Sequence, residues 1–277
     1  MIINFYKIVT VVFVLLFANC LKAQDTSNIN RDIWLVNIAT PYTLNKGGIQ
    51  LDMFGRYTNY GFPDPRTDVA DFIFVGNYGI MDRLSLSVTT PFSWISGDPN
   101  NLGFTDILLG VKYKLLRRNG FTLSVSPILS LPVGKKEDLL GSGKVNLMVD
   151  INVAYTINHL TFFTNGGFGK GQYVQGDVII NPSGSFGGLR GKVKNEYVIM
   201  GSGGISFDLL SRLTVLFEGV GQIVPEFSDK DFYFQVGGIL RIHNLLRLKG
   251  SGGLGLPNGT KSIIDGRVTL GFSYLMN

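Results

Sequence analysis

The sequence offers few of the side chains that enzymes use as nucleophiles, general bases or metal ligands. Its 277 residues contain two histidines, His159 and His243, and one cysteine, Cys20. Neither histidine has a serine and an acid near it in the pattern of a Ser-His-acid triad. No His, Cys or Asp cluster shows the spacing of metal ligands. We therefore predict that the protein is not an enzyme and expect no catalytic residues, metal or cofactor.

Two glycine patterns resemble nucleotide-binding motifs but lack the context that these motifs need. Gly250-Ser-Gly-Gly-Leu-Gly255 matches G-x-G-x-x-G, yet a dinucleotide site requires a helix after the motif, and here the neighbouring residues alternate as in a strand. Gly143-Lys144 lacks the following Ser or Thr, and the earlier glycine, of a phosphate-binding loop. We interpret both patterns as glycines of strands and turns.

The remaining candidates are charged side chains that alternate with apolar ones. In Val111-Lys-Tyr-Lys-Leu115, for example, both lysines fall on one face and the apolar residues on the other. Strands of this kind build barrels that are apolar outside and polar inside. The candidates for the solute path through such a lumen are Asp52, Arg56, Lys112, Lys114, Asp150, Glu218, Arg241, Arg247, Lys249 and Arg267, and Asp106 is assigned to the same face.

Two interpretations of this lumen stay open. Basic candidates outnumber acidic ones, so Lys112 and Lys114 on one side and Arg241, Arg247 and Lys249 on the other could form an electropositive constriction that selects anions. Alternatively, the charges neutralise one another in a packed polar interior, because an unpaired charge is costly there.

Period-two alternation predicts the elements that position these side chains. The clearest segments are 49–57, 84–90, 107–115, 121–125 and 145–155, and the weaker ones are 70–80, 160–169, 196–208, 212–222, 232–242, 245–256 and 263–276. They predict twelve strands, each long enough to cross the hydrocarbon when tilted. An even number is typical of single-chain bacterial barrels.

The connections between these segments alternate strictly in length. The short ones are 81–83, 117–120, 158–159, 209–212 and 243–244, and the long ones are 61–69, 95–105, 133–144, 170–195, 223–231 and 257–262. Outer-membrane barrels have short periplasmic turns and longer extracellular loops. The alternation therefore predicts that both ends of the barrel chain lie in the periplasm.

Composition supports a barrel and excludes several other classes. Only 16% of the residues are charged while 45% are hydrophobic, which is too little charge for an ordinary soluble domain. After residue 24 no apolar run is long enough for a transmembrane helix. The formal net charge of +5 comes from scattered basic residues, which argues against a nucleic-acid partner.

The N-terminus has the order of a secretory signal peptide. Lys7 precedes an apolar run from Ile8 to Phe17, and Ala23 offers a small residue for cleavage. We predict a signal peptide at 1–23, a short periplasmic segment at 24–46 and a barrel at 47–277. Lipidation of Cys20 is the less favoured alternative, because Phe17-Ala-Asn19 is a poor lipidation box.

Several motifs resemble one family of bacterial outer-membrane barrels. They are Gly103-Phe-Thr-Asp-Ile-Leu-Leu-Gly-Val-Lys-Tyr-Lys-Leu-Leu116, Leu131-Pro-Val-Gly134 with Gly141-Ser-Gly-Lys144, Asn165-Gly-Gly-Phe168, Thr40-Pro-Tyr-Thr-Leu-Asn-Lys-Gly47 and Ile80-Met-Asp-Arg-Leu84. Over about residues 36–175 the chain resembles proteins named for the MetA pathway of phenol degradation or as transporters. The resemblance implies uptake of small, often aromatic molecules and no catalytic residue. Asn277 departs from the terminal Phe that is common in such barrels.

We therefore predict an all-β protein, a 12-stranded antiparallel up-and-down transmembrane β-barrel in the outer membrane of a Gram-negative bacterium. The expected partners are outer-membrane lipid, the barrel-assembly machinery and a small-molecule solute. The expected function is passage of a small, aromatic or anionic molecule. The alternative is a plugged barrel without a transport role, which serves structure or surface interaction through loop 170–195.

Overall fold

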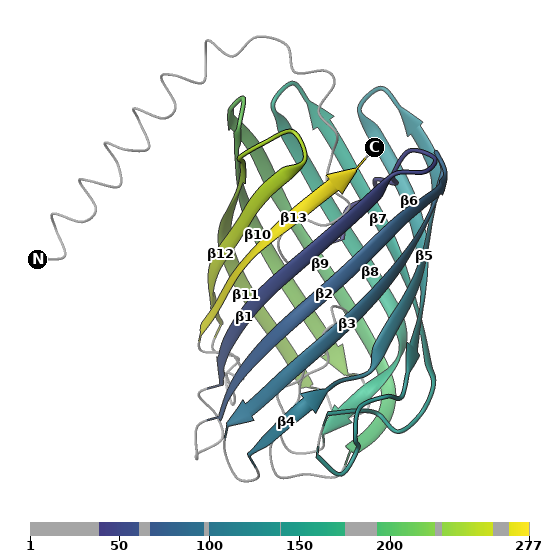
Figure 1. The fold of residues 1–277 in the computed structure, drawn as a ribbon, viewed down its shortest axis with the longest axis vertical. Coiled ribbons are helices and arrows are strands. Elements are labelled where there is room, and N and C mark those ends of the chain that lie inside the picture. Colours follow the sequence, from purple (N-terminus) through teal and green to yellow (C-terminus); the bar gives the residue numbers. More distant parts are fainter. Residues whose placement is uncertain are drawn as a thin grey trace, which may run out of the picture.

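The computed structural model describes residues 39–60, 67–96, 100–138, 140–174, 193–224, 229–256 and 266–276, and these form one closed antiparallel β-barrel (Figure 1). The predicted signal peptide, Cys20 and most of segment 24–46 lie outside the described residues. So do parts of the predicted long connections, including 175–192 of the connection 170–195.

The strands follow one another around the barrel almost in chain order. They are β1 (Ile49–Tyr60), β2 (Thr67–Met81), β3 (Leu84–Ser96), β4 (Asn101–Phe104), β5 (Ile107–Arg118), β6 (Phe121–Leu131), β7 (Asn146–Ile157), β8 (Leu160–Val174), β9 (Val193–Leu210), β10 (Leu213–Val224), β11 (Asp229–Arg241), β12 (Leu246–Gly255) and β13 (Gly266–Met276). β1 pairs with β13 on one side and β2 on the other, which closes the ring.

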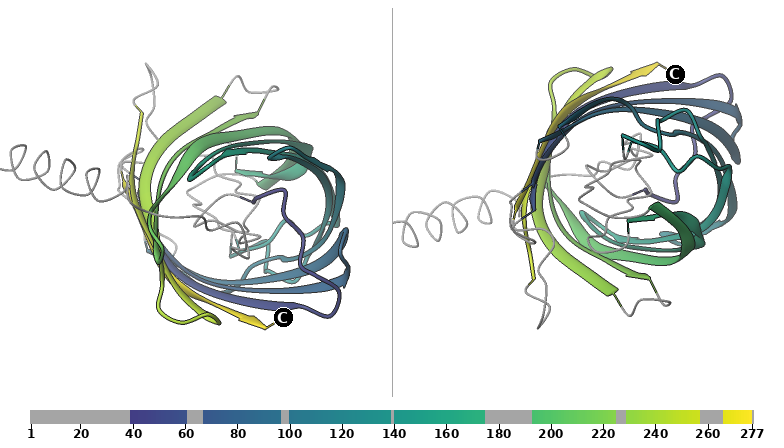
Figure 2. Two further views of the ribbon diagram at one scale, coloured as in Figure 1. Left: turned by 90° about the horizontal axis from the view of Figure 1, so that it is seen from above. Right: turned by 90° about the horizontal axis from the view of Figure 1, so that it is seen from below.

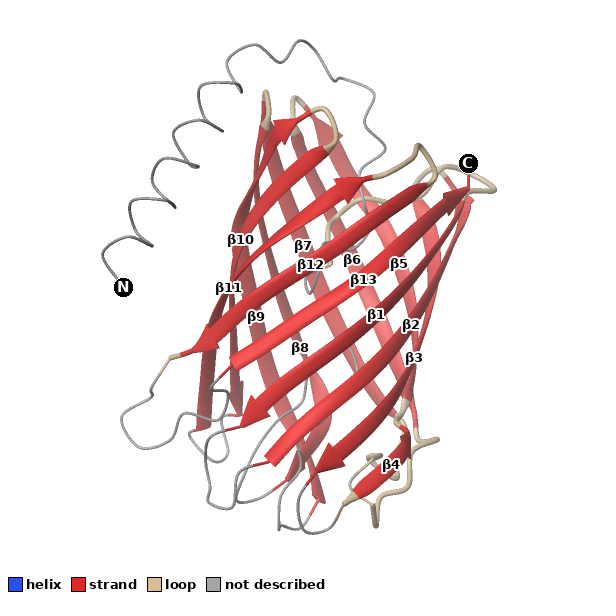
Figure 3. Cartoon of the chain, turned by 60° about the vertical axis from the view of Figure 1, so that its left-hand side comes forward, coloured by secondary structure: helices blue, strands red, loops and turns tan. Residues whose placement is uncertain are grey.

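The twelve predicted strands are confirmed within the described part of the chain. The additional strand β4 falls in the predicted connection 95–105 and pairs only with the end of β3, where Phe104 lies opposite Phe92. All twelve strands of the ring are tilted relative to the barrel axis (Figure 3). No helix among the described residues is long and apolar enough to cross a membrane.

Side chains alternate between the two faces of the barrel wall. On β7, Asp150 and Asn152 are buried inside, whereas Leu147, Val149 and Ile151 are exposed on the outer surface. The same alternation of buried polar and exposed apolar side chains recurs on β1, where Asp52 and Arg56 are buried. The wall therefore presents an apolar surface suited to hydrocarbon and keeps its charges inside.

Exposed aromatic side chains form a band near each end of the barrel. Tyr78, Tyr113, Tyr155, Phe162 and Tyr274 lie toward the end with the short turns, and Trp94, Phe104, Phe168, Tyr197 and Phe232 lie toward the other end. Bands of this kind flank the hydrocarbon in outer-membrane barrels. We use the name periplasmic girdle for the first band, because short turns are periplasmic in such barrels.

The predicted short turns are confirmed, and their backbone explains their residue choice. Between β5 and β6, Asn119 has φ 48° and Gly120 φ 81°, as in the type I′ turns that asparagine and glycine favour. A Cβ atom on Gly120 would lie 2.3 Å from the Thr156 carbonyl oxygen, so the turn also packs closely on β7. The end of β13 lies at the same end of the barrel (Figure 1).

If the exposed side chains of β7 face lipid, replacing one of them by arginine should lower the free energy of unfolding, and more so near the middle of the membrane than at its edge. Ile151 lies in the middle of β7 and Ile157 at its periplasmic end, and both are exposed. Ile151→Arg should lower the free energy of unfolding by about 2–4 kcal/mol and Ile157→Arg by at most about 1 kcal/mol. Reversible unfolding in lipid vesicles measures both, and equal losses would contradict the assignment.

Candidate functional site: the barrel lumen

A buried ion pair joins the two ends of the barrel chain inside the lumen. The Lys249 ammonium on β12 lies 2.9 Å from the Asp52 carboxylate on β1, and both side chains are fully buried. Gln50 donates from its amide to both oxygens of Asp52, at 3.1 and 2.9 Å. Asp52 is therefore compensated by one cation and one amide group.

Gly271 makes this ion pair possible. It lies on β13, between the strands that carry Lys249 and Asp52. A Cβ atom on Gly271 would lie 2.4 Å from Cδ1 of Phe54, and the Lys249 ammonium lies 5.7 Å from the centre of the Phe54 ring. Only glycine leaves room here for the aromatic ring beneath the lysine.

A second ion pair lies one layer closer to the long loops. Nε of Arg56 on β1 donates to Asp71 on β2 at 3.1 Å, with both side chains buried, and the Ser93 hydroxyl on β3 donates to the other Asp71 oxygen at 2.6 Å. Asp71 is not among the lumen residues that the sequence predicts. Its alternation with the aromatic residues Phe72 and Phe74 was the signal that places it on the inner face.

Arg267 on β13 is a buried cation still closer to the long loops. Its Nε donates to the Thr58 hydroxyl at 3.1 Å, and its guanidinium lies 4.6 Å from the centre of the Tyr233 ring on β11. Arg247 on β12 is also buried, opposite Ser273 of β13. Arg247, Lys249 and Arg267 thus place three cations on the inner wall formed by β12 and β13.

Glu218 on β10 is held by an amide group. The Gln235 side chain of β11 donates to Oε2 of Glu218. The buried Oε1 of Glu218 has no hydrogen-bond partner in the described residues. The Ser251 hydroxyl in turn donates to Gln235 at 3.4 Å. A carboxylate without a cation partner is costly to bury unless water solvates it. In the described residues the Gln235 amide is the hydrogen-bond partner that compensates this burial.

Lys112 and Asp150 lie on a different wall of the barrel, formed by β5 and β7. Both side chains are buried and line a small cavity together with Asn77, Ser85, Ser87 and Ser126. The Lys112 ammonium donates to the Thr40 carbonyl at 2.6 Å. Lys112 and Lys249, which belong to the two basic groups predicted on opposite sides of the lumen, lie on different walls, β5 and β12.

The segment Ala39–Leu44, which we term the strap, lies inside the short-turn end of the barrel (Figure 2). Its Leu44 amide donates to the Ser85 hydroxyl at 3.0 Å on β3, whereas Asn165 of β8 donates to Ala39 at 3.5 Å. Tyr42 packs against the buried cluster Ala154, Phe163, Leu216 and Ile239. The strap therefore contacts separate walls of the barrel and narrows its mouth at the short-turn end.

The structure places three of the predicted lumen residues away from the buried inner wall. Lys114 and Arg241 lie at the rim with the short turns, where Lys114 is half-buried and Arg241 donates to the Ser211 carbonyl at 2.9 Å. Asp106 does not line the solute path either. It precedes β5 and accepts hydrogen bonds from Gly134 and Ser142, at 3.2 and 2.9 Å. Asp106 was misassigned because it stands in the irregular link between β4 and β5, where period-two parity does not apply.

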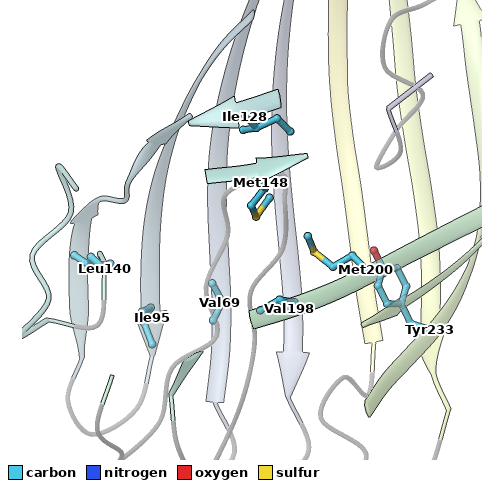
Figure 4. Close-up of a cluster of buried hydrophobic side chains, with 8 residues drawn as sticks. All are labelled: Val69, Ile95, Ile128, Leu140, Met148, Val198, Met200 and Tyr233. Carbon is cyan, nitrogen blue, oxygen red and sulfur yellow. The ribbon is translucent and has the colours of Figure 1, made fainter. Parts of the chain in front are cut away.

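The inner face is not polar throughout. An apolar cluster lies inside the barrel toward the long loops, with side chains from several strands (Figure 4). Its members are Val69, Ile95, Ile128, Leu140, Met148, Val198, Met200 and Tyr233. A solute entering from the long-loop end would therefore meet apolar side chains as well as Arg267, which contacts Tyr233.

The described residues contain no group of three or more His, Cys, Asp or Glu side chains placed to hold a metal ion. His159 and His243 lie in the turns after β7 and β11, away from the inner wall. The Leu245 amide donates to Nδ1 of His243 at 3.4 Å. Both residues thus have the turn positions that the sequence predicts.

Comparisons with known proteins agree with this architecture. A family model described as "Putative MetA-pathway of phenol degradation" matches residues 35–178. An outer membrane channel from Pseudomonas putida F1 has a TM-score of 0.66 and 12% identity, over 87% of this chain and 100% of that one. No curated protein matches the sequence.

Two solved porins share the fold. The NanC porin has a TM-score of 0.55 and 11% identity, over 81% of this chain and 98% of that one. The KdgM porin, solved in complex with disordered oligogalacturonate, has a TM-score of 0.54 and 11% identity, over 82% of this chain and 99% of that one. At these identities the likeness concerns the fold alone.

Breaking the pair between Lys249 and Asp52 should destabilise the barrel. Lys249→Met leaves the Asp52 carboxylate buried with only Gln50 as its partner, and we expect a loss of about 3 kcal/mol in the free energy of unfolding. The double variant Lys249→Met/Asp52→Asn should recover most of this loss, because no charge then stays uncompensated. Urea unfolding in vesicles tests both, and a double variant as unstable as the single one would contradict the pairing.

Proposed function

The chain belongs to the family defined by the MetA-pathway model of phenol degradation, which matches over half of its residues, and from this premise we propose that it is an outer-membrane channel for a small solute. The observation that carries the proposal is the series of charged side chains along the inner wall. Arg267, Arg56, Lys249 and Arg247 follow one another on β1, β12 and β13 from the long-loop half toward the short turns. A solid apolar core would not bury charges in this way.

The solute class that this wall favours is a small anion with an apolar or aromatic part. Carboxylate and phosphate groups are recognised by arginine and lysine side chains, which the wall offers as Arg247, Lys249 and Arg267. The apolar cluster around Tyr233 would accept the rest of such a molecule. The ion pairs of Lys249 and Arg56 weaken the positive potential, so the anion preference should be modest.

A plugged barrel without a transport role is the second candidate, and the strap favours it. Thr40 and Leu44 of the strap are buried and bonded to the neighbouring strands β5 and β3, through Lys112 and Ser85, while Ala39 is bonded to Asn165 of β8. If the strap never leaves, solute cannot pass. The two candidates therefore differ in whether the folded protein conducts ions.

Planar-bilayer recording of the purified protein tests the channel. We expect steady conductance steps and a reversal potential in a salt gradient that indicates anion preference. Arg247→Gln/Arg267→Gln should reduce this preference, because it removes two cations from the inner wall, whereas Lys136→Gln in an exposed loop should not. Cation preference of the unmodified protein would exclude the proposed solute class, and silence of a folded barrel would favour the plug.

The strap has a separate test. Lys112→Met removes the ammonium that bonds to Thr40, so the strap should leave the lumen more often and the open-state current should rise. Lys114→Met is the matched control, because this lysine lies at the rim on the same strand. Equal currents in wild type and both variants would show that the Lys112 contact does not restrict conduction.

A further inference from the structure

The periplasmic rim carries a strong excess of positive charge. Its basic side chains in the described residues are Lys46, Arg83, Lys114, Arg117, Arg118, Arg212 and Arg241, and its acidic ones are Asp82 and Asp208. Both acids already accept hydrogen bonds: Asp82 from the Lys46 amide at 3.0 Å, and Asp208 from the Thr214 hydroxyl at 2.5 Å. The proposed solute path uses none of these cations.

Four of the cations come together at two adjacent turns. β3 pairs with β5, and the Lys114 amide donates to the Arg83 carbonyl at 2.8 Å. The turn before β3 carries Arg83, and the end of β5 carries Arg117 and Arg118. None of these three arginines forms an ion pair with an acid in the described part of the chain. We name this group the turn cluster: Arg83, Lys114, Arg117 and Arg118.

A β-bulge on β5 places apolar side chains directly beside the turn cluster. The register between β5 and β6 shifts between Lys114 and Leu116, so Leu115 and Leu116 together oppose Leu123. Both leucines are exposed on the outer surface, 49% and 46% respectively. After the bulge, Arg118 lies opposite Phe121 and has the same outward parity as Leu116.

The depth of this patch matches the headgroup region of a membrane. Tyr113 on β5 and Tyr155 on β7 belong to the periplasmic girdle, and Tyr155 lies opposite Phe121. Aromatic girdles mark the boundary between hydrocarbon and headgroups. Arg83 and Arg118 therefore lie at headgroup level, with Leu115 and Leu116 on the hydrocarbon side of them.

We propose that the turn cluster binds the phosphate of an anionic phospholipid in the periplasmic leaflet, with Arg83 and Arg118 on the headgroup and Leu115 and Leu116 against the acyl chains. Arginine forks match phosphate oxygens in pairs, and basic side chains next to a membrane attract anionic lipid. The exposed leucines favour a lipid over an acidic protein, whose surface would leave them uncovered. The inference uses the proposed orientation in the outer membrane but does not require transport.

Native mass spectrometry of the detergent-solubilised full barrel, mixed with equal amounts of phosphatidylglycerol and phosphatidylcholine, tests the site. We expect phosphatidylglycerol adducts to dominate. Arg83→Gln/Arg118→Gln should lower their share by about tenfold, since each arginine contributes to attraction of the anionic lipid. Arg212→Gln is the matched control, an exposed rim arginine on the turn between β9 and β10, and should keep the preference. Heat-modifiable migration in gels confirms that each variant is folded.

Four other outcomes would contradict the proposal. An unchanged lipid preference in the double variant would overturn it, and so would equal loss in Arg212→Gln, which would indicate attraction by the whole rim. Displacement of phosphatidylglycerol by inorganic phosphate at low millimolar concentration would show that the acyl chains do not contribute. Preference for lipopolysaccharide over phosphatidylglycerol would place this end of the barrel in the opposite leaflet. A silent barrel in bilayers would disprove the channel and leave this result untouched.

Discussion

The structure depends on one constraint, that every backbone amide and carbonyl must be paired where no water reaches it. A barrel meets this constraint only when it closes, and closure here is the pairing of β1 with β13 along eleven residues of β1, from Ile49 to Asn59. Because successive side chains of a strand point to opposite faces, closure gives each strand one face toward the lumen and one toward the outside. The residues on these two faces then make the exterior apolar and the interior charged.

Closure also determines how the inner charges are compensated. Lys249 and Asp52 lie 197 residues apart in the chain, and they meet because β12, β13 and β1 are neighbours in the ring. Arg56 and Asp71 meet across one hairpin. With such pairs on the wall, the lumen holds charge without a large net field. This arrangement suits a channel with a modest anion preference. A narrow ring of unpaired cations would instead give a strong one.

Three surfaces of the molecule have separate tasks in the functions proposed here. The inner wall of β1, β12 and β13 offers groups for a solute, while the strap controls the width of the periplasmic mouth through Lys112 and Ser85. The outer surface contacts lipid, and the turn cluster adds a site for anionic headgroups. A change in β5 can affect the strap and the outer surface together, because Lys112 contacts the strap, Leu115 faces the lipid and Arg118 belongs to the turn cluster.

The sequence by itself determined the strands, the alternation of their faces and the short turns, because period-two patterning and turn chemistry are local properties of the chain. It also placed Lys249, Asp52, Lys112 and Asp150 on inner faces. Only the tertiary structure decided which charges meet, that Asp71 joins Arg56, that Asp106 holds a loop and that the strap lies in the lumen. These contacts depend on strand register and ring closure, which bring together residues that are distant in the chain. Local sequence patterns cannot predict which distant residues become neighbours.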